Sequence, residues 1–328
     1  METPGQVTPD ARPHLTMSAI LPTYRREELL VNTVRAIARQ LEPGDEILVV
    51  DQSPTHRPEV QSALSEMHTA GVIRWIRKTH PNQAEAMNVG ALLATGEVLL
   101  FLDDDIEPFA GLVAAHRRAL ERLPEDAVTT GQVLQPWNPE PVKSVADHEL
   151  AFDFAFDRPC EVRSLMAGNY ALRRRTYLAL GGMDENYRGS NYRNDAEMAW
   201  RVHARTGRLI QFVPEAGMRH LLAAGGNRAF GGKDSWRNVG GSAGDYYFAL
   251  KWLPWPRAGL YTVRRLLRAP VSRATVRRPW LIPSLFVREL VGIAIASFRL
   301  IARRGNYVKD LSSYVDVARE TRAVESTR

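Results

Sequence analysis

Apolar positions follow two different periods along the first 135 residues of the chain. Short apolar runs rich in β-branched residues predict strands at residues 18–23, 46–51, 72–78 and 97–103. Apolar residues at helical spacing lie between them, for example Leu29, Leu30, Val34 and Ile37, then Ala86, Val89, Leu92 and Leu93. Strands that alternate with helices favour an α/β fold with a mostly parallel sheet covered by helices. Because the strands are apolar throughout, we expect both faces of the sheet to be buried.

Charge divides the chain into two parts. Residues 251–328 contain 16 Lys and Arg against 5 Asp and Glu, whereas the first 250 residues contain 27 basic and 32 acidic residues. We therefore expect a mildly acidic body over 17–250 and a basic, helical region over 251–328, after a disordered N-terminus at 1–16. The single cysteine, Cys160, excludes an intrachain disulfide and favours a reducing compartment. The N-terminus has no apolar stretch typical of a signal peptide, so we expect a cytoplasmic protein.

Carboxylates gather where two of the predicted strands end. Asp51 follows one apolar run, and Asp103, Asp104 and Asp105 follow another. Ligands of open α/β sheets bind beyond the carboxyl ends of the strands. The sequence has neither the GxGxxG fingerprint of dinucleotide folds nor the P-loop, so phosphates need another means of binding. Clustered aspartates suit a hard divalent cation, Mn2+ or Mg2+, that can hold a diphosphate. The alternative is a solvated loop that caps a helix starting near Pro108.

Several motifs together resemble the family 2 glycosyltransferases, which have the GT-A fold. They are a "PTYNR"-like turn (Pro22, Thr23, Tyr24, Arg25), a "VVDxS" element (Val49 to Ser53), an "N…N.G" helix (Asn82, Asn88, Gly90), a DxD motif (Asp103, Asp105), a "GGFDE"-like turn (Gly181 to Glu185) and an "ED.(D/E)...R"-like helix (Asn194 to Arg201). The resemblance covers residues 17–225 and implies a GT-A type, Rossmann-like sheet. It assigns residues 17–135 to nucleotide binding and 136–250 to the acceptor.

The resemblance implies a donor site in the first half. Thr23 and Asp51 would bind the nucleotide base, and Arg25 would lie near the ribose or diphosphate. Asp103 would contact both ribose and metal, and Asp105 would coordinate the cation with His220 as a third ligand. The other matching positions are Pro22, Tyr24, Asn82, Asn88 and Asp104, of which Asp104 could simply point away.

The second half would hold the acceptor and the catalytic base. The family's general base matches Asp195, while the preceding position is Asn194 instead of the usual Glu. Asn169, Asp184 and Glu197 would lie with Asn194 near the sugar and acceptor pocket. Read without the resemblance, Asn194 is a helix N-cap followed by acids that the helix dipole favours, and Asn169 and Asp184 are turn residues. The glycine-rich segments 225–228 and 231–237 suit either a loop that closes over a diphosphate or an ordinary surface loop.

The expected reaction is the transfer of one sugar from a nucleotide-sugar to an acceptor hydroxyl. One base and no apparent nucleophile imply a single displacement with inversion. The QxxRW motif of processive members is absent, so we expect one sugar for each binding event. The acceptor could be a glycan, a lipid-linked molecule or a small molecule.

Three other functions compete with this interpretation. A sugar-phosphate nucleotidyltransferase normally has a glycine-rich loop after the first strand, and "LPTYRREELL" has none. A nucleic-acid-binding protein would explain the basic region but not the clustered acids, so we expect no nucleic-acid partner. A non-catalytic nucleotide-sugar-binding protein would follow if Asp195 were misplaced.

Residues 284–304 read as a helix with a wide apolar face. Arg288, Arg299 and Arg303 share one side, with Gly292 between them. Basic residues beside an apolar face suit an anionic membrane surface, with Trp252, Trp255 and Trp280 as further anchors. The alternative is a helix whose apolar face packs on the catalytic domain. The expected location is therefore the cytoplasm, either free or peripheral on the inner face of the membrane.

Overall fold

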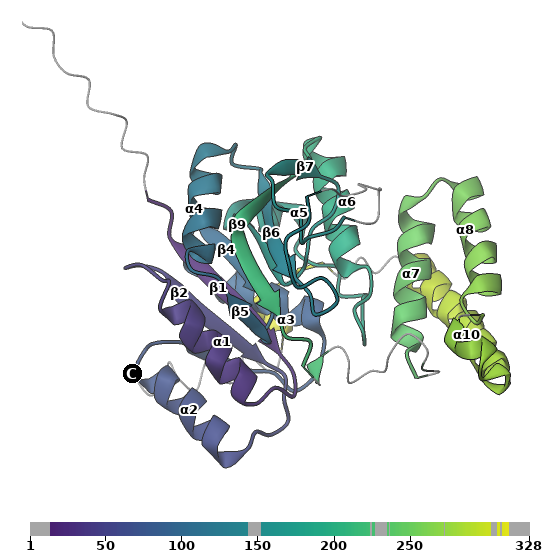
Figure 1. Cartoon of the computed structure of the whole chain (residues 1–328), viewed down its shortest axis with the longest axis horizontal. Coiled ribbons are helices and arrows are strands. Elements are labelled where there is room, and N and C mark those ends of the chain that lie inside the picture. The colour runs from purple at the N-terminus through teal and green to yellow at the C-terminus, as the bar shows by residue number, and fades with distance from the viewer. Residues whose placement is uncertain are drawn as a thin grey trace, which may run out of the picture.

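A mixed β-sheet forms the centre of the molecule (Figure 1). The computed structural model describes residues 14–143, 152–223, 225–226, 235, 237–271, 273–302, 307–308 and 310–314. Within them the strands are β1 Met17–Thr23, β2 Glu46–Asp51, β3 Arg74–Arg77, β4 Val98–Leu102, β5 Ile106–Pro108, β6 Val128–Leu134, β7 Cys160–Val162, β8 Asn169–Arg173 and β9 Ile210–His220. Their order is β3-β2-β1-β4-β8-β6-β9-β5, with β7 paired to β9.

The sheet changes character at β4. Strands β3, β2, β1 and β4 are parallel, as the strand–helix alternation predicts. Beyond them β8 is antiparallel to both β4 and β6, and β9 is antiparallel to β5. Parallel pairing therefore holds for the four strands that end at Leu102, and the strands after them form a mixed extension.

Helices cover both faces of the sheet. They are α1 Glu28–Ala38, α2 Pro58–Thr69, α3 Gln83–Leu93, α4 Leu112–Arg122, α5 Arg174–Leu180, α6 Asn194–Thr206, α7 Val239–Trp252, α8 Trp255–Arg268, α9 Arg273–Val276 and α10 Ile282–Ile301, with short 3-10 helices at Pro279–Leu281 and Leu311–Ser313. Alternate residues of each strand enter opposite cores, because side chains of a strand alternate between faces. Ile20 belongs to the core that includes residues of α3, α5 and α6, whereas Leu21 belongs to the core that includes residues of α1, α2 and α4.

One predicted boundary was wrong. A helix was expected to start near Pro108, but β5 occupies Ile106–Pro108 and α4 starts only at Leu112. Gly111, just before it, has a φ of 84°, a left-handed value that glycine adopts without strain. The chain uses this turn to leave β5 and enter α4.

Helices α7, α8 and α10 pack together beside the sheet (Figure 1). Helices α7 and α10 approach closely at Gly292 of α10, where a Cβ atom would lie 2.7 Å from the Cβ of Ser242 on α7. Because α7 starts at Val239, the helical lobe begins before residue 251, where the charge pattern suggested a boundary.

Helix α10 leaves most of its apolar side exposed, contrary to the alternative in which that side packs on the rest of the protein. Its buried residues are Leu285, Arg288, Glu289, Gly292 and Ala296. Arg288, one of the arginines expected to border the apolar face, is therefore inside the protein. It pairs with Glu289 at 2.7 Å. Arg303 lies outside the described residues.

After α10 the chain returns to the catalytic core. The backbone N–H of Val308 donates to the carbonyl of Gly181 at 2.8 Å, and the Tyr314 hydroxyl donates to Glu185 at 2.5 Å. Tyr314 and Leu311 join the same core as α3 and α5. The helical lobe is therefore tied to the core on both sides.

Candidate active site

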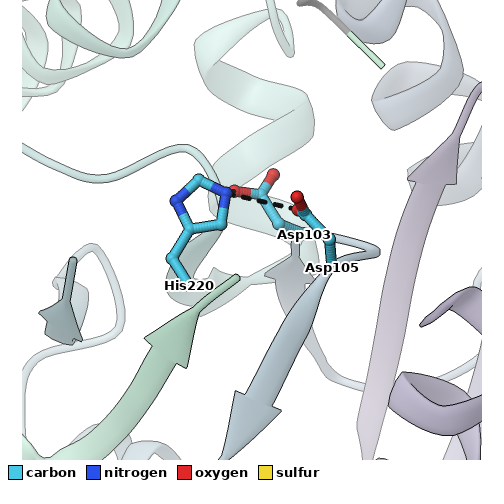
Figure 2. Close-up of side chains that lie close together, drawn as sticks. All are labelled: Asp103, Asp105 and His220. Carbon is cyan, nitrogen blue, oxygen red and sulfur yellow. Dashed lines mark ion pairs between the residues drawn. The ribbon is translucent and has the colours of Figure 1, made fainter. Parts of the chain in front are cut away.

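Two aspartates and a histidine converge at the ends of β4 and β9. The Nε2 atom of His220 lies 3.2 Å from Asp105 Oδ1 and 3.8 Å from Asp103 Oδ2 (Figure 2). Antiparallel pairing of β5 with β9 places Ile106 opposite His220 and so brings the histidine beside the aspartates. The ligand atoms of all three residues lie within 4.8 Å of one another.

The donor set fits a divalent cation. Carboxylate oxygens and a neutral imidazole nitrogen suit Mn2+, and carboxylates suit Mg2+. His220 Nδ1 lies 3.2 Å from the side-chain oxygen of Gln135, to which it donates as Nδ1–H. Donation from Nδ1 is the usual arrangement of a metal-ligating histidine, whose Nε2 would then bind the cation.

A glycine makes room for Asp103. A Cβ atom at Gly168 would lie 2.1 Å from Asp103 Oδ2, which is far inside van der Waals contact. The carbonyl of Gly168 also accepts a hydrogen bond from the backbone N–H of Asp103 at 3.1 Å. The loop before β8 thus fixes the first aspartate of the cluster, a role that the sequence did not reveal.

Arg26 neutralises the other two aspartates. It contacts Asp104 Oδ1 and Asp105 Oδ2, each at 3.0 Å, and donates to the carbonyl of Ala223 at 2.7 Å. Burial raises the pKa of Asp104 to about 6, against the opposing charge of Arg26. Burial also opposes the ionisation of Asp105, but the hydrogen bond and charge of His220 hold its pKa below the ordinary value.

A pocket opens over this cluster and contains much of the expected donor site. It is lined by Pro22, Thr23, Tyr24, Arg26, Gln52, Gln83, Asp103, Asp104, Asp105, His220 and Gly226. Gly226 donates its N–H to the carbonyl of Tyr24 at 2.8 Å, which brings the segment after β9 to the pocket rim. Most of the two glycine-rich segments, 227–234 and 236, falls outside the described residues.

Arg25 lies elsewhere than the resemblance suggested. Its φ of 54° turns the chain so that Arg25 is exposed, 5.2 Å from the Tyr24 ring centre, while Arg26 enters the pocket. The arginine that reaches the aspartates is thus the second of the pair. Sequence reasoning missed it because two adjacent arginines give no sign of which one points inward.

Asp51 lies buried beside the pocket and already has several partners. Its Oδ2 contacts His56 at 2.9 Å, the Trp75 indole N–H at 3.1 Å and Arg77 at 3.1 Å. Burial opposes its ionisation, yet the hydrogen bonds from His56 and from the Ser53 N–H lower its pKa. The next residue, Gln52, is the one that lines the pocket.

A second pocket adjoins the first and contains Asp195. It is lined by Gln83, Asp103, Phe152, Phe154, Ser164, Leu165, Met166, Ala167, Gly168, Ser190, Asn191, Tyr192, Arg193, Asn194, Asp195 and Ala196. Gln83 and Asp103 line both pockets, so the two share a wall. Tyr192 and two phenylalanines give the second pocket aromatic surfaces of the kind that pack on sugar rings.

Asp195 lies at the start of α6, as the sequence predicts. Its Oδ1 accepts the N–H of Ala196 at 2.7 Å, and Arg193, at the N-cap position, has a left-handed φ of 74°. Burial raises the pKa of the Asp195 carboxyl, although the hydrogen bond from Ala196 opposes the shift. A raised pKa makes a carboxylate a stronger base.

Three residues expected at the acceptor lie buried away from the pocket surface. Asn169 bonds through its side chain to His116 at 2.9 Å and to the carbonyl of Ala216 at 2.8 Å. Asp184 and Glu197 share the Lys251 ammonium, at 2.8 and 2.7 Å. Of the expected acceptor residues other than Asp195, Asn194 is the one that lines the pocket.

The two asparagines of the predicted "N…N.G" helix support other parts of the site. Asn82 is the N-cap of α3 and bonds to the carbonyl of Glu185 at 3.2 Å. Asn88 is fully buried and fixes the turn before Glu185. Its side-chain oxygen accepts the Met183 N–H at 2.8 Å, and its side-chain nitrogen donates to the Met183 carbonyl at 3.0 Å. Neither lines the donor pocket, whereas the intervening Gln83 does.

Solved structures share this architecture. A structure of GalNAc-T7 with UDP, GalNAc and Mn2+ superposes with a TM-score of 0.51 at 17% identity, over 63% of this chain and 43% of that one. A mannosyltransferase from Pyrobaculum calidifontis in complex with GDP-Man and Mn2+ superposes with a TM-score of 0.53 at 19% identity, over 97% of this chain and 90% of that one. The sheet and its covering helices are those of a GT-A glycosyltransferase.

The sequence comparisons point to one family. Residues 18–180, just under half of the chain, match the model described as Glycosyl transferase family 2. An uncharacterized glycosyltransferase of Haemophilus influenzae is 35% identical over 89 residues, which cover 27% of this chain and 29% of that protein. A glucosyl-dolichyl phosphate glucuronosyltransferase of Haloferax volcanii is 24% identical over 63% of this chain and 70% of its own length.

Proposed function

We propose that the protein transfers one sugar from a nucleotide-sugar to an acceptor hydroxyl, with inversion at the anomeric carbon and with a divalent cation. The observation that carries the proposal is the shared wall of the two pockets. Asp103 belongs to the carboxylate–imidazole set of the first pocket and also lines the second, which contains Asp195. A donor in one pocket and an acceptor in the other would meet at this wall.

In this proposal the first pocket receives the nucleotide diphosphate. Asp103, Asp105 and His220 would hold Mn2+ or Mg2+, which supplies positive charge to stabilise the leaving phosphate. Arg26 keeps Asp104 and Asp105 from repelling each other and adds positive charge at the pocket wall. Thr23 and Tyr24 lie at the rim expected for the nucleoside.

Asp195 is the proposed general base. Its carboxylate accepts the proton of the acceptor hydroxyl as that oxygen forms a bond to the anomeric carbon and the nucleoside diphosphate leaves. Positioned proton transfer is worth about 10²- to 10⁴-fold in rate. A single displacement of this kind inverts the anomeric centre.

The acceptor proposal includes glycans, small molecules and lipid-linked molecules. Lipid-linked acceptors gain support from the Haloferax relative, whose name includes a dolichyl phosphate. We further propose that the protein acts in the cytoplasm, on the inner face of the membrane, where such an acceptor is available.

Metal-dependent donor binding tests the site. Wild-type protein is screened by thermal shift against nucleotide-sugars with and without Mn2+, and the preferred donor should raise the melting temperature only with the cation. Asp105→Asn should abolish this cation-dependent increase. Glu107→Gln, an exposed carboxylate two residues away, is the matched control and should retain it. An Asp105→Asn protein that binds donor as the control does would refute the metal assignment.

A further inference from the structure

The outward side of α10 is apolar along its whole length. Val287, Leu290, Val291, Phe298 and Ile301 are all exposed, and the last two reach 72% and 79%. The residues of the helix that face inward are Leu285, Arg288, Glu289, Gly292 and Ala296, which include an arginine and a glutamate. A helix at the surface of a soluble protein has the reverse arrangement.

Helix α8 adds a second apolar stripe. Leu260, Val263 and Leu267 recur at helical spacing and are each at least half exposed, while Ala258 is buried. Exposed tryptophans lie next to both helices: Trp255 at the start of α8 and Trp280 just before α10 are 82% and 71% exposed. Tryptophan is the side chain most typical of the boundary between lipid and water.

The charge around these stripes has one sign. Between residues 253 and 302 the sequence contains a single acid, Glu289, and it is fully buried. Among the arginines of this stretch whose burial the structure describes, five are exposed: Arg257, Arg264, Arg268, Arg277 and Arg278. Three of them follow α8 along one border of its apolar stripe. The apolar surface is bordered only by cations. Such a surface complements an anionic lipid surface better than a neutral one.

We propose that the outward sides of α8 and α10, with Trp255 and Trp280, form a monotopic binding surface for a bilayer that contains anionic phospholipid. In Figure 1 these helices lie at the end of the molecule away from α1 and α2. Both would lie in the plane of the interface, with their apolar side chains among the acyl chains and their arginines at the phosphates. This proposal does not depend on the transfer chemistry.

The inward contacts of α10 favour a helix lying on the bilayer over one crossing it. Pro279–Ile301 is the one stretch of the described residues long and apolar enough to cross a membrane, and 28% of its most apolar window is buried. However, Glu289 bonds to Ser242 of α7 at 2.6 Å and to Arg265 of α8 at 3.2 Å. Crossing would bring α7 into the bilayer as well.

Helix α7 is held to the catalytic core in turn. Its Lys251 pairs with Glu197 of α6 at 2.7 Å, and Phe248 packs edge-on against Trp200 at 5.4 Å. A bilayer that enclosed α10 would therefore have to break this buried network. A surface position requires no such change.

Vesicle flotation of the full chain tests the proposal. The protein should float with phosphatidylcholine vesicles that contain phosphatidylglycerol, and high salt should weaken binding. Arg264→Glu with Arg268→Glu should lower the partition coefficient by at least about tenfold. Arg118→Glu with Arg122→Glu, which alters exposed arginines of α4, is the matched control and should float as wild type does.

The apolar contribution is tested separately. Trp280→Ser with Phe298→Ser should reduce flotation, whereas Trp137→Ser, which alters a tryptophan 74% exposed on the catalytic domain, should not. Equal flotation with neutral and anionic vesicles, or none with either, would overturn the proposal. The proposal would also be overturned if the wild type self-associates and the variants lose flotation only because they have become monomers.

Measurements of immersion depth distinguish a helix that lies on the bilayer surface from one that crosses the bilayer. Spin labels are placed by Val287→Cys or Ile301→Cys in a Cys160→Ser background, and their accessibility to oxygen is compared on vesicles. These positions are about 21 Å apart along the axis at 1.5 Å per residue. Equal shallow depths support the proposal, and labels at clearly different depths overturn it.

Discussion

Arg25 and Arg26 are neighbours with opposite surroundings. Arg25 is exposed, whereas Arg26 is 5% exposed and paired with two buried carboxylates. Removing one partner of a buried ion cluster leaves its charges uncompensated, which typically costs about 3–5 kcal/mol. The same change at an exposed position usually costs within about 0.5 kcal/mol.

We therefore expect Arg26→Gln to lower the free energy of unfolding by about 3–5 kcal/mol at neutral pH. Added Mn2+ should restore part of this loss, because a cation on Asp105 replaces the missing charge. Arg25→Gln serves as the control and should unfold as wild type does. Chemical denaturation with and without Mn2+ measures both, and equal losses at the two positions would contradict the ion-pair assignment.

Asp195 provides a prediction about turnover. Asp195→Asn preserves shape but removes the proton acceptor, so kcat should fall by about 10²- to 10⁴-fold. Donor binding, measured by thermal shift, should be unchanged. Asn194→Ala, at the adjacent position of the same pocket, is the comparison and should retain most of kcat.

The pH profile of the wild type tests the same residue. Burial raises the pKa of Asp195, and the base works only when deprotonated. We therefore expect kcat/KM to fall as pH decreases through a pKa above the ordinary aspartate value of about 4. A flat profile down to that value would assign the base to another group.

At the scale of elements, replacing each of two glycines by alanine should change the free energy of unfolding in opposite directions. A Cβ at Gly292 meets Ser242 at 2.7 Å, whereas one at Gly259 on α8 meets nothing within 4 Å. Gly292→Ala should lower the free energy of unfolding by about 1–3 kcal/mol through overpacking of α7 and α10. Gly259→Ala should raise it by up to about 1 kcal/mol through helix propensity. Thermal unfolding of both variants measures the difference in sign.

The elements that the sequence predicts well are those set by local pattern. The strands at residues 46–51 and 18–23 were predicted to within one residue, because their apolar runs end in distinct turn residues. Asp103, Asp105 and His220 also come together as the resemblance implied. Long-range pairing is harder to infer, and nothing local distinguishes antiparallel β8 from a parallel strand.

Helix α10 shows a different limit. Its periodicity identifies two faces correctly but does not say which one is inside. The usual assumption buries the apolar face, yet Arg288 and Glu289 are buried because partners on α7 and α8 are available to them. Asn169 and Glu197 illustrate the same point, since their buried partners come from distant segments.

At the scale of the whole molecule, the helical lobe and the active site form one connected structure. Lys251 at the end of α7 pairs with Asp184 and Glu197, and the segment after α10 bonds to Gly181 and Glu185. Glu185 also bonds to Asn88, at the base of the donor half. Docking of the lobe would consequently fix the orientation of both pockets relative to the bilayer.

The wall shared by the two pockets has a consequence for the order of events. Asp103 and Gln83 line both pockets. In the proposed single displacement, donor and acceptor would therefore occupy the enzyme together before any bond breaks. Initial rates measured over a grid of both concentrations should give double-reciprocal lines that intersect, where a substituted-enzyme pathway would give parallel ones.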